Sequence, residues 1–588
     1  MDRLSLQFLR IGIAGFALSA ISSAQMTVTL TPSMPSPAPL ATMITWNAAV
    51  SNPATDVIWY RFRVREVGAG DYTMIRDYSP LASLDWTASD HEGLYQMEVS
   101  AKDRLTGDLA ATSSTYQMLS RVTSGGPEIS PTAHPLVFLY SALCPGGSQM
   151  KVQFQAQDGI IQETPYKACQ AGLSVNFYLA GLRSSTAYVA RHVIDSNGQL
   201  TTGPALIFGM TQATPGLFTE TVIQPPAAAV SSPILLGSSL AGAVAHDLEG
   251  HVVWYSNNGI YVVTRAEDGG YFWGTIESEL FDVSQQVIRK FDLVGMTVLE
   301  TNAARVNEQL TAMGRRPITG FHHEARTLPD GRIAALAGVE QILTDVQGPG
   351  PVDVLGDMIV VFDSNLNVVW TWDTFDHLDV TRKAILGETC GPISGCAPFY
   401  LAKTANDWTH GNAIQQTQDG ELLYSSRHQD WLIKVSYQNG TGDGHVIWRL
   451  GQDGDFQINS SDPWPWFSHQ HDANFELSDP SALLVFDDGN TRVTSNGGNS
   501  RGQALKLDEP NRTASFILNA DLGVFSLAVG SAQLLPDHNY HFDAGFVPEG
   551  AGVAYSIEVD GTGHFVYEAK ANTILYRTFR MTNLYTPN

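Results

Sequence analysis

Apolar and polar residues alternate in short runs along residues 27–120, as in TVTLTP, VIWYRFRVREV and YQMEVSAKD. Such alternation is typical of strands with one buried face, and short strands separated by regular turns indicate an immunoglobulin or fibronectin-like sandwich. After the linker SGGPEISPTAHP the pattern returns over residues 134–212, with LVFLYSA, MKVQFQAQ and VNFYLAGL. We therefore predict two β-sandwich domains, at residues 25–122 and 130–214.

From residue 216 two hairpin phrases alternate. The first is an aspartate, a turn and a strand that often ends in an aromatic residue, as in DLEGHVVWY from Asp247 and DSNLNVVWTW from Asp363. The second is a strand, a turn such as Pro-Asp-Gly and another strand, as in HHEARTLPDGRIAALAG and HGNAIQQTQDGELLYSS. Repeated pairs of hairpins predict blades of four strands. We therefore expect an all-β chain in which residues 216–588 form a six-bladed β-propeller that follows the two sandwiches.

A histidine opens the second phrase in three of its copies, at His323, His410 and His471. It stands 7, 9 and 8 residues before the aspartate of the turn. In a propeller the innermost strands converge on a central channel, so equivalent positions in successive blades face one place. Arg427 ends the partner strand of the His410 hairpin and returns to the same end. Three imidazoles and one guanidinium are thus predicted to line one cavity.

This set of side chains restricts the chemistry. Three histidines can hold zinc, and the runs HH and SHQH fit that interpretation, but a neighbouring guanidinium repels a cation. Arginine instead matches the oxygens of a planar or tetrahedral anion, and histidine acts as nucleophile, acid or base. The set therefore favours transfer of an anionic group such as a sulfuryl or phosphoryl unit. The sequence has no P-loop or dinucleotide-binding fingerprint, so a nucleotide donor is unsupported.

Composition and net charge exclude some classes of binding partner. The 588 residues are 43% hydrophobic and only 16% charged, with a formal net charge of −25. These values predict a globular chain and argue against a nucleic acid or an anionic membrane as the partner. An anionic substrate would need a local positive pocket in so acidic a protein.

The first 24 residues resemble a secretory signal peptide, with a basic start, an apolar stretch and the small residues Ser-Ser-Ala before Gln25. No other stretch is hydrophobic over a membrane-spanning length, so we expect export to the periplasm or to the exterior. The four cysteines are even in number, which favours disulfides in an oxidising compartment. The local pairings are Cys144–Cys169 and Cys390–Cys396.

Four motifs, HHEARTLPDG, DWTHGNAI, SSRH and FSHQHDANF in this order, resemble the bacterial aryl-sulfate sulfotransferases over roughly residues 220–588. The resemblance implies a propeller behind an N-terminal β-sandwich domain. It also implies a ping-pong transfer of a sulfuryl group from an aryl sulfate to a phenol, without a nucleotide cofactor. The transient sulfohistidine maps to His471, and the other functional positions map to His323, His410 and Arg427. Two sandwiches, where the family has one smaller domain, leave a homodimer an open question.

We expect His471 to attack sulfur while Arg427 holds the sulfuryl oxygens, with His323 and His410 as acid and base. His322 remains an alternative to its neighbour His323. Four residues in or beside the motifs are expected to contact the substrate: His322, Trp408, Asn412 and Phe467. No metal is assigned to the site, although a structural calcium ion in a loop is not excluded. Two other functions stay open, namely a metal-dependent propeller hydrolase or lyase that uses the same histidines, and a non-catalytic exported scaffold.

Overall fold

The computed structural model is all-β, with three short α-helices among the residues that it describes. The predicted signal peptide, residues 1–24, lies outside the described residues. The description covers residues 25–587 except for 158, 210–215, 227–231, 240–241, 257–261, 277–281, 392–395 and 477. The helices are α1 (Ala303–Ala312), α2 (Thr374–His377) and α3 (Asn490–Asn496). Within the described part of the chain, no helix is both long and apolar enough to cross a membrane.

The N-terminal residues form two sheets that share one core. One sheet has the order β1-β3-β6, with β1 (Thr27–Pro32), β3 (Ile44–Ser51) and β6 (Ser83–Trp86). The strands facing it run in the order β2 (Ala38–Pro39), β8 (Leu109–Leu119), β7 (Gly93–Asp103), β4 (Ile58–Glu66) and β5 (Thr73–Ser79). Alternate residues point inward, so Trp46, Phe62 and Val99 from both sheets meet in one buried cluster. The two sheets therefore face each other across a common core, and a separate sandwich domain at residues 25–122 stays a prediction.

A second pair of sheets follows. One has the order β14-β10-β9, with β14 (Ser174–Leu179), β10 (Phe138–Leu143) and β9 (Glu128–Pro131). The other contains β11 (Gln149–Ala156), β12 (Gln162–Glu163), β13 (Lys167–Ala168), β15 (Ala187–Ser196), β16 (Gln199–Thr202) and β17 (Leu206–Gly209). The disulfide Cys144–Cys169 joins the ends of β10 and β13, and Cys390 is bonded to Cys396. Both predicted pairings are confirmed.

The rest of the described chain contributes six groups of at least four strands each. The first group is β22 (Val262–Glu267), β23 (Tyr271–Ile276), β24 (Val287–Asp292) and β25 (Thr297–Asn302). The second is β26 (Gly320–Thr327), β27 (Ile333–Thr344), β28 (Pro351–Phe362) and β29 (Val368–Asp373), with β30 (Thr389–Cys390) and β31 (Ala405–Asp407). The third is β32 (Gly411–Gln416), β33 (Leu422–Ser426), β34 (Trp431–Val435) and β35 (Val446–Gly451).

Two of the other three groups combine strands from both ends of this region. The three are β37 (His471–Phe475), β38 (Ala482–Asp487), β39 (Arg501–Asp508) and β40 (Thr513–Asp521), with β36 (Gln457–Ile458); β41 (Gly530–Leu534), β42 (Tyr540–Val547), β43 (Val553–Val559) and β44 (Phe565–Ala571), with β18 (Glu220–Gln224); and β19 (Ile234–Ser239), β20 (Gly242–Asp247) and β21 (Val252–Tyr255), with β45 (Arg577–Met581).

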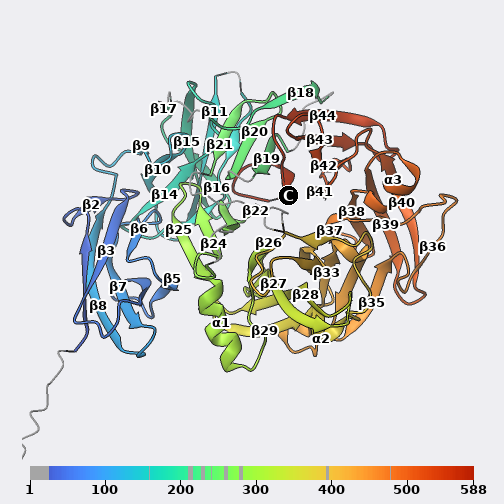
Figure 1. Ribbon diagram of the computed structural model, residues 1–588. Helices are drawn as coiled ribbons and strands as arrows, with labels where there is room; N and C mark the ends of the chain where they lie inside the picture. Colours follow the sequence, from blue (N-terminus) through green and yellow to red (C-terminus); the bar gives the residue numbers. More distant parts are fainter. Residues whose placement is uncertain are drawn as a thin grey trace, which may run out of the picture.

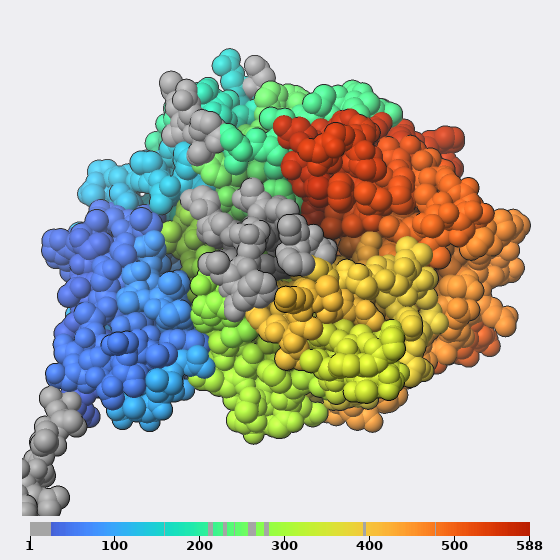
Figure 2. All heavy atoms as spheres, in the orientation of Figure 1, coloured from blue at the N-terminus to red at the C-terminus, as the bar shows by residue number. Residues whose placement is uncertain are grey.

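These groups lie around a common centre, with β19, β22, β26, β37 and β41 innermost (Figure 1). Around this centre β22 contacts β26, β26 contacts β32, β32 contacts β37, and β37 contacts β41. Chain order therefore follows the circumference, as the colours from green to red show in Figure 2. The structure shows this arrangement of sheets, whereas a closed six-bladed propeller stays a prediction.

Adjacent residues in the middle strands pack into different sheet interfaces. Leu422 joins a buried cluster with the preceding sheet, and Leu423 joins the cluster with the following sheet. The same division separates Leu483 from Leu484. Because both faces of such strands are buried, their sequences are continuous apolar runs such as ALLVF instead of alternating ones.

The two ends of the region hydrogen-bond to each other. Strand β45, near the C-terminus, pairs with β19 through Leu236 and Phe579, and β18 pairs with β44. The first and last segments thus complete two of the sheets, which leaves fewer free strand edges.

We predict that Phe579→Ala weakens this junction. Phe579 is 2% exposed on β45, so its truncation should leave a cavity and lower the free energy of unfolding by about 3–5 kcal/mol. The measurement is denaturant unfolding of the full chain. Val369→Ala, at a position 43% exposed on β29, is the control and should change stability by less than about 0.5 kcal/mol. Equal effects of the two changes would contradict the importance of the junction.

Candidate active site

The three innermost strands that contain or directly follow the predicted histidines are interrupted by β-bulges. The strand register shifts between Phe321 and Ala325 in β26, Gly411 and Ala413 in β32, and His471 and Asn474 in β37. The backbone φ is positive at His323 (57°), at His410 (48°) and at Asp472 (46°). A bulge bends the strand and turns a side chain away from the alternating pattern. The bulges therefore decide which way these side chains point.

The predicted histidines gather at this end of the strands. The ring centroids of His323 and His410 lie 5.0 Å apart. Tyr576, just before β45, packs edgewise against His323 at 5.4 Å and against His471 at 6.4 Å. The structure thus brings the three histidines together, with a tyrosine between two of them that the sequence analysis did not identify.

Arg427 reaches the same place from the end of β33. It begins the 3₁₀ turn η1 (Arg427–Gln429), and its backbone N–H donates to the carbonyl of His410. Its Nη1 contacts His428 Nε2 at 2.6 Å, and its Nη2 donates to the carbonyl of Leu527 at 3.1 Å. Its buried Nε–H has no hydrogen-bond acceptor among the described residues. Part of this guanidinium is therefore fixed, and part remains available to an anion.

His471 combines a fixed ring with a neutral charge state. Its Nδ1 lies 2.6 Å from the Asp488 carboxylate, and both side chains are almost completely buried. Burial and the nearby charge of Arg427 lower the pKa of His471 well below its usual value. Burial raises the pKa of Asp488, whereas the charge of Arg427 lowers it. We assign the proton of this contact to His471 Nδ1, which leaves the lone pair on Nε2, an atom with no hydrogen bond to the described residues. A neutral imidazole held in this tautomer is a competent nucleophile.

Carboxylates also hold the other histidines. Asp407 lies 2.7 Å from His410 Nδ1, and Asp357 lies 3.0 Å from His322 Nε2. The His322 side chain is 2% exposed and turned toward Asp357, whereas His323 is partly exposed. The two rings meet through their Nδ1 atoms at 2.8 Å. Burial, followed by the neighbouring His322 and His410, lowers the pKa of His323 well below its usual value.

A fully buried guanidinium lies beneath these rings. Arg577 donates from Nη1 to Glu324 at 2.7 Å and from Nη2 to the carbonyl of Asn412 at 2.6 Å, and it lies 3.6 Å from Asp472. It thereby links β45 to β26, β32 and β37. Burial alone would lower its pKa, but Glu324 and Asp472 outweigh that effect and raise it.

The remaining predicted substrate contacts lie deeper in the structure. Asn412 is fully buried and donates to the carbonyl of Gln470 at 2.7 Å. Trp408 is buried, and its indole N–H donates to the carbonyl of Arg382. Phe467 packs in the hydrophobic cluster between the sheets of β32 and β37. Both aromatic side chains are only 1% exposed in this structure, and contact with a substrate stays a prediction for them.

A nearby set of potential metal ligands consists of Glu388, His428 and His469. The His428 Nδ1 donates to the carbonyl of Asp407 at 2.7 Å, and its Nε2 accepts from Arg427. Both nitrogens of His469 contact carboxylates, those of Glu388 and Asp430. Although burial acts in the opposite direction, these carboxylates raise the pKa of His469. To bind here, a metal would have to break the hydrogen bond from Arg427 to His428 Nε2 and remove a proton from His469. The donor set therefore fits a metal poorly.

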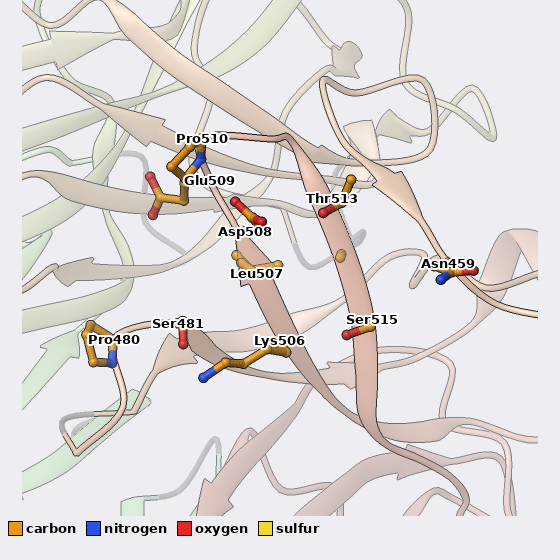
Figure 3. Close-up of a pocket in the computed structure, with 11 residues that line it drawn as sticks. Asn459, Pro480, Ser481, Lys506, Leu507, Asp508, Glu509, Pro510, Thr513 and Ser515 are labelled. Carbon is orange, nitrogen blue, oxygen red and sulfur yellow. The ribbon is translucent and has the colours of Figure 1, made fainter.

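A separate groove of about 730 Å³ lies on the sheet of β39 and β40 (Figure 3). Its lining includes Lys506 and Leu507 from β39 and Thr513 and Ser515 from β40. None of the histidines or arginines described above lines this groove. The candidate site is therefore defined by the side-chain cluster at the bulged strand ends.

Comparisons with known proteins identify one family. The family described as Arylsulfotransferase (ASST) matches residues 219–578. No curated protein matches the chain. Two solved chicken structures are similar at a TM-score of 0.13 each: the FN1–FN3 domains of CNTN1 (10% identity, 30% of this chain and 68% of that chain) and the interferon gamma receptor alpha chain (8% identity, 32% and 100%). At such TM-scores these likenesses carry no argument about the fold.

We predict that Arg577→Met destabilises the whole region. The change leaves Glu324 and Asp472 buried without their counter-charge, which should cost about 3–5 kcal/mol of unfolding free energy. Thermal and denaturant unfolding measure this loss. Arg63→Gln removes the more exposed ion pair with Glu98 and should cost no more than about 1 kcal/mol. If Arg577→Met is as mild as this control, the buried guanidinium does not hold the strands together.

Proposed function

The chain belongs to the arylsulfotransferase family, and we propose that it transfers a sulfuryl group from an aryl sulfate to a phenol through a sulfohistidine. One observation carries the proposal. The neutral imidazole of His471, held by Asp488, occurs in the same cluster as the guanidinium of Arg427. A nucleophile and an anion-binding group at one place are what group transfer from a sulfate ester requires.

In the first half-reaction His471 Nε2 attacks sulfur. The Nε2–S bond forms while the bond from sulfur to the aryl oxygen breaks, and the aryl oxygen leaves with a proton from His323 or His410. The sulfated ring keeps its Nδ1 proton, and the positive charge of that ring is matched by Asp488. Arg427 offers its free Nε–H to the sulfuryl oxygens, whose negative charge it stabilises.

In the second half-reaction the phenol oxygen attacks the same sulfur. Its proton passes to the histidine that served as the acid, the Nε2–S bond breaks, and His471 recovers its lone pair. The low pKa of His323 makes its imidazolium a strong acid toward the leaving aryl oxygen, and the ring is then neutral when the phenol arrives and gives up its proton. The reaction uses no group other than the chain's own side chains.

The same proposal includes the architecture and the location. We infer that the six groups of strands are the blades of a six-bladed propeller and that residues 25–122 and 130–214 are separate sandwich domains. Neighbour contacts around the centre and the pairing of β45 with β19 support the propeller. Export is supported by two disulfides, which persist in oxidising compartments.

We predict that acceptor-dependent release of nitrophenolate from 4-nitrophenyl sulfate is abolished by His471→Ala. Without its nucleophile the enzyme should lose at least about 10⁴-fold in rate, as other covalent catalysts do. His564→Ala, a change at an exposed histidine, is the matched control and should retain full activity. Activity should also survive excess chelator. Release that is equally fast without phenol would indicate a sulfatase, and loss in chelator would favour the metal-dependent alternative.

The lowered pKa of His471 gives a second prediction. The imidazole is nucleophilic only above its pKa, so kcat/KM should stay flat as the pH falls from 7.5 to about 6. Arg427→Gln removes a cation that lowers this pKa, so the acid limb should move to higher pH while kcat falls about 10²–10³-fold. A pH–rate profile of both proteins measures this shift. An acid limb of the unchanged enzyme near pH 7 would contradict a neutral, buried nucleophile.

A further inference from the structure

A second cavity lies where the first sandwich meets the ring of sheets. Strand β5 of the sandwich pairs in parallel with β25, at Arg76 and Glu300, so one sheet continues from β2 to β22. A cavity of about 480 Å³ opens over this seam. Ligand sites occur preferentially at such junctions between domains, and the volume falls in their usual range. None of the histidines of the candidate active site lines it.

Two arginines in the cavity share a single carboxylate. Arg76 donates from Nε to Glu300 Oε1 at 2.6 Å, and Arg289 donates from Nε to Glu300 Oε2 at 2.5 Å. The side chains are 7% exposed for Arg76, 15% for Arg289 and 3% for Glu300. Each oxygen of the Glu300 carboxylate thus accepts from one of the two guanidiniums, and both guanidiniums are largely shielded from water.

Several donors of this pair remain unused. Arg76 also donates from Nη1 to the carbonyl of Ser83, which leaves Nη2. For Arg289, neither Nη1 nor Nη2 has an acceptor within the described part of the chain. Glu300 neutralises only one of the two positive charges. Asp85, which also lines the cavity, lies on an exposed part of β6 and accepts from the Thr45 hydroxyl at 2.6 Å. The inner end of the cavity therefore offers a guanidinium fork with a surplus of N–H donors.

The remaining wall is largely apolar. It includes Met43, Leu81, Val294 and Met296. A small inorganic ion would leave these side chains unused, whereas an anion with a hydrophobic body would contact both parts. Guanidinium forks match the parallel oxygens of carboxylates and sulfate esters. We propose that this cavity is a second binding site, separate from the histidine cluster, for an organic monoanion with an apolar group, either a carboxylate or a sulfate monoester.

Equilibrium binding to the full chain tests the proposal. The probes are 4-nitrobenzoate and 4-nitrophenyl sulfate, measured separately to distinguish the two anions, in a His471→Ala background where transfer cannot consume the ester. Adding Arg289→Gln removes half of the fork but leaves Glu300 paired with Arg76. Adding Met296→Trp fills the cavity and keeps both arginines. Adding Arg63→Gln is the control, because Arg63 pairs with Glu98 elsewhere on the sandwich.

We expect at least one probe to bind at a site that Arg289→Gln and Met296→Trp each weaken about tenfold or more, while Arg63→Gln and Arg427→Gln leave it unchanged. Thermal unfolding of each variant confirms that the fold is intact. If all binding is lost with Arg427→Gln and kept in both cavity variants, the cavity binds no such anion and the proposal fails. If neither probe binds at all, it fails as well.

The outcome is independent of the proposed transfer reaction. A single site that is lost with Arg289→Gln but kept with Arg427→Gln would support the cavity and speak against anion binding at the histidine cluster.

Discussion

A buried cation must be paired with acceptors from the surrounding chain, because it has lost its contacts with water. Arg577 is such a cation, where the innermost strands meet. Its partners Glu324, Asn412 and Asp472 belong to three different strands. Each of them follows a predicted catalytic histidine by one or two residues, in the runs HE, HGN and HD. The guanidinium that holds the strands together therefore also fixes the distances between the histidines. Stability and the geometry of the candidate site depend on the same contacts.

The electrostatics of the site follow from this arrangement. A chain with a net charge of −25 would repel an anionic substrate, yet the bulged strand ends concentrate Arg427, Arg577 and several imidazoles. Three of the imidazoles are each oriented by a carboxylate, His471 by Asp488, His410 by Asp407 and His322 by Asp357. Burial and the neighbouring cations keep His471 neutral, so the positive charge needed to bind an anion is carried by arginine and not by the nucleophile. Binding and attack can then be performed by separate groups at one pH.

Local patterns were sufficient for the features that are local or repeated. Alternation predicted strands between residues 27 and 209, the even number and local positions of the cysteines predicted the two disulfides, and the matched register of His323, His410 and His471 predicted that they meet. Tyr576 and Arg577 were missed because β45 belongs to a sheet begun more than 300 residues earlier, and no short stretch records that pairing. The directions of His322 and His323 were undecided because a bulge interrupts the alternation there. Trp408 and Phe467 were assigned to the substrate because they are near the histidines in sequence; the structure shows both side chains buried, and their contact with a substrate stays a prediction.

The most direct test of the account is to look for the covalent intermediate. The protein would be incubated with 4-nitrophenyl sulfate in the absence of a phenol, stopped, digested and examined by mass spectrometry under conditions that preserve an N–S bond. Transfer through a sulfohistidine predicts one sulfuryl group on the peptide that contains His471, located on that side chain and removed when phenol is added before the stop. A protein that releases nitrophenolate and carries the group on another residue, or on none, would contradict it.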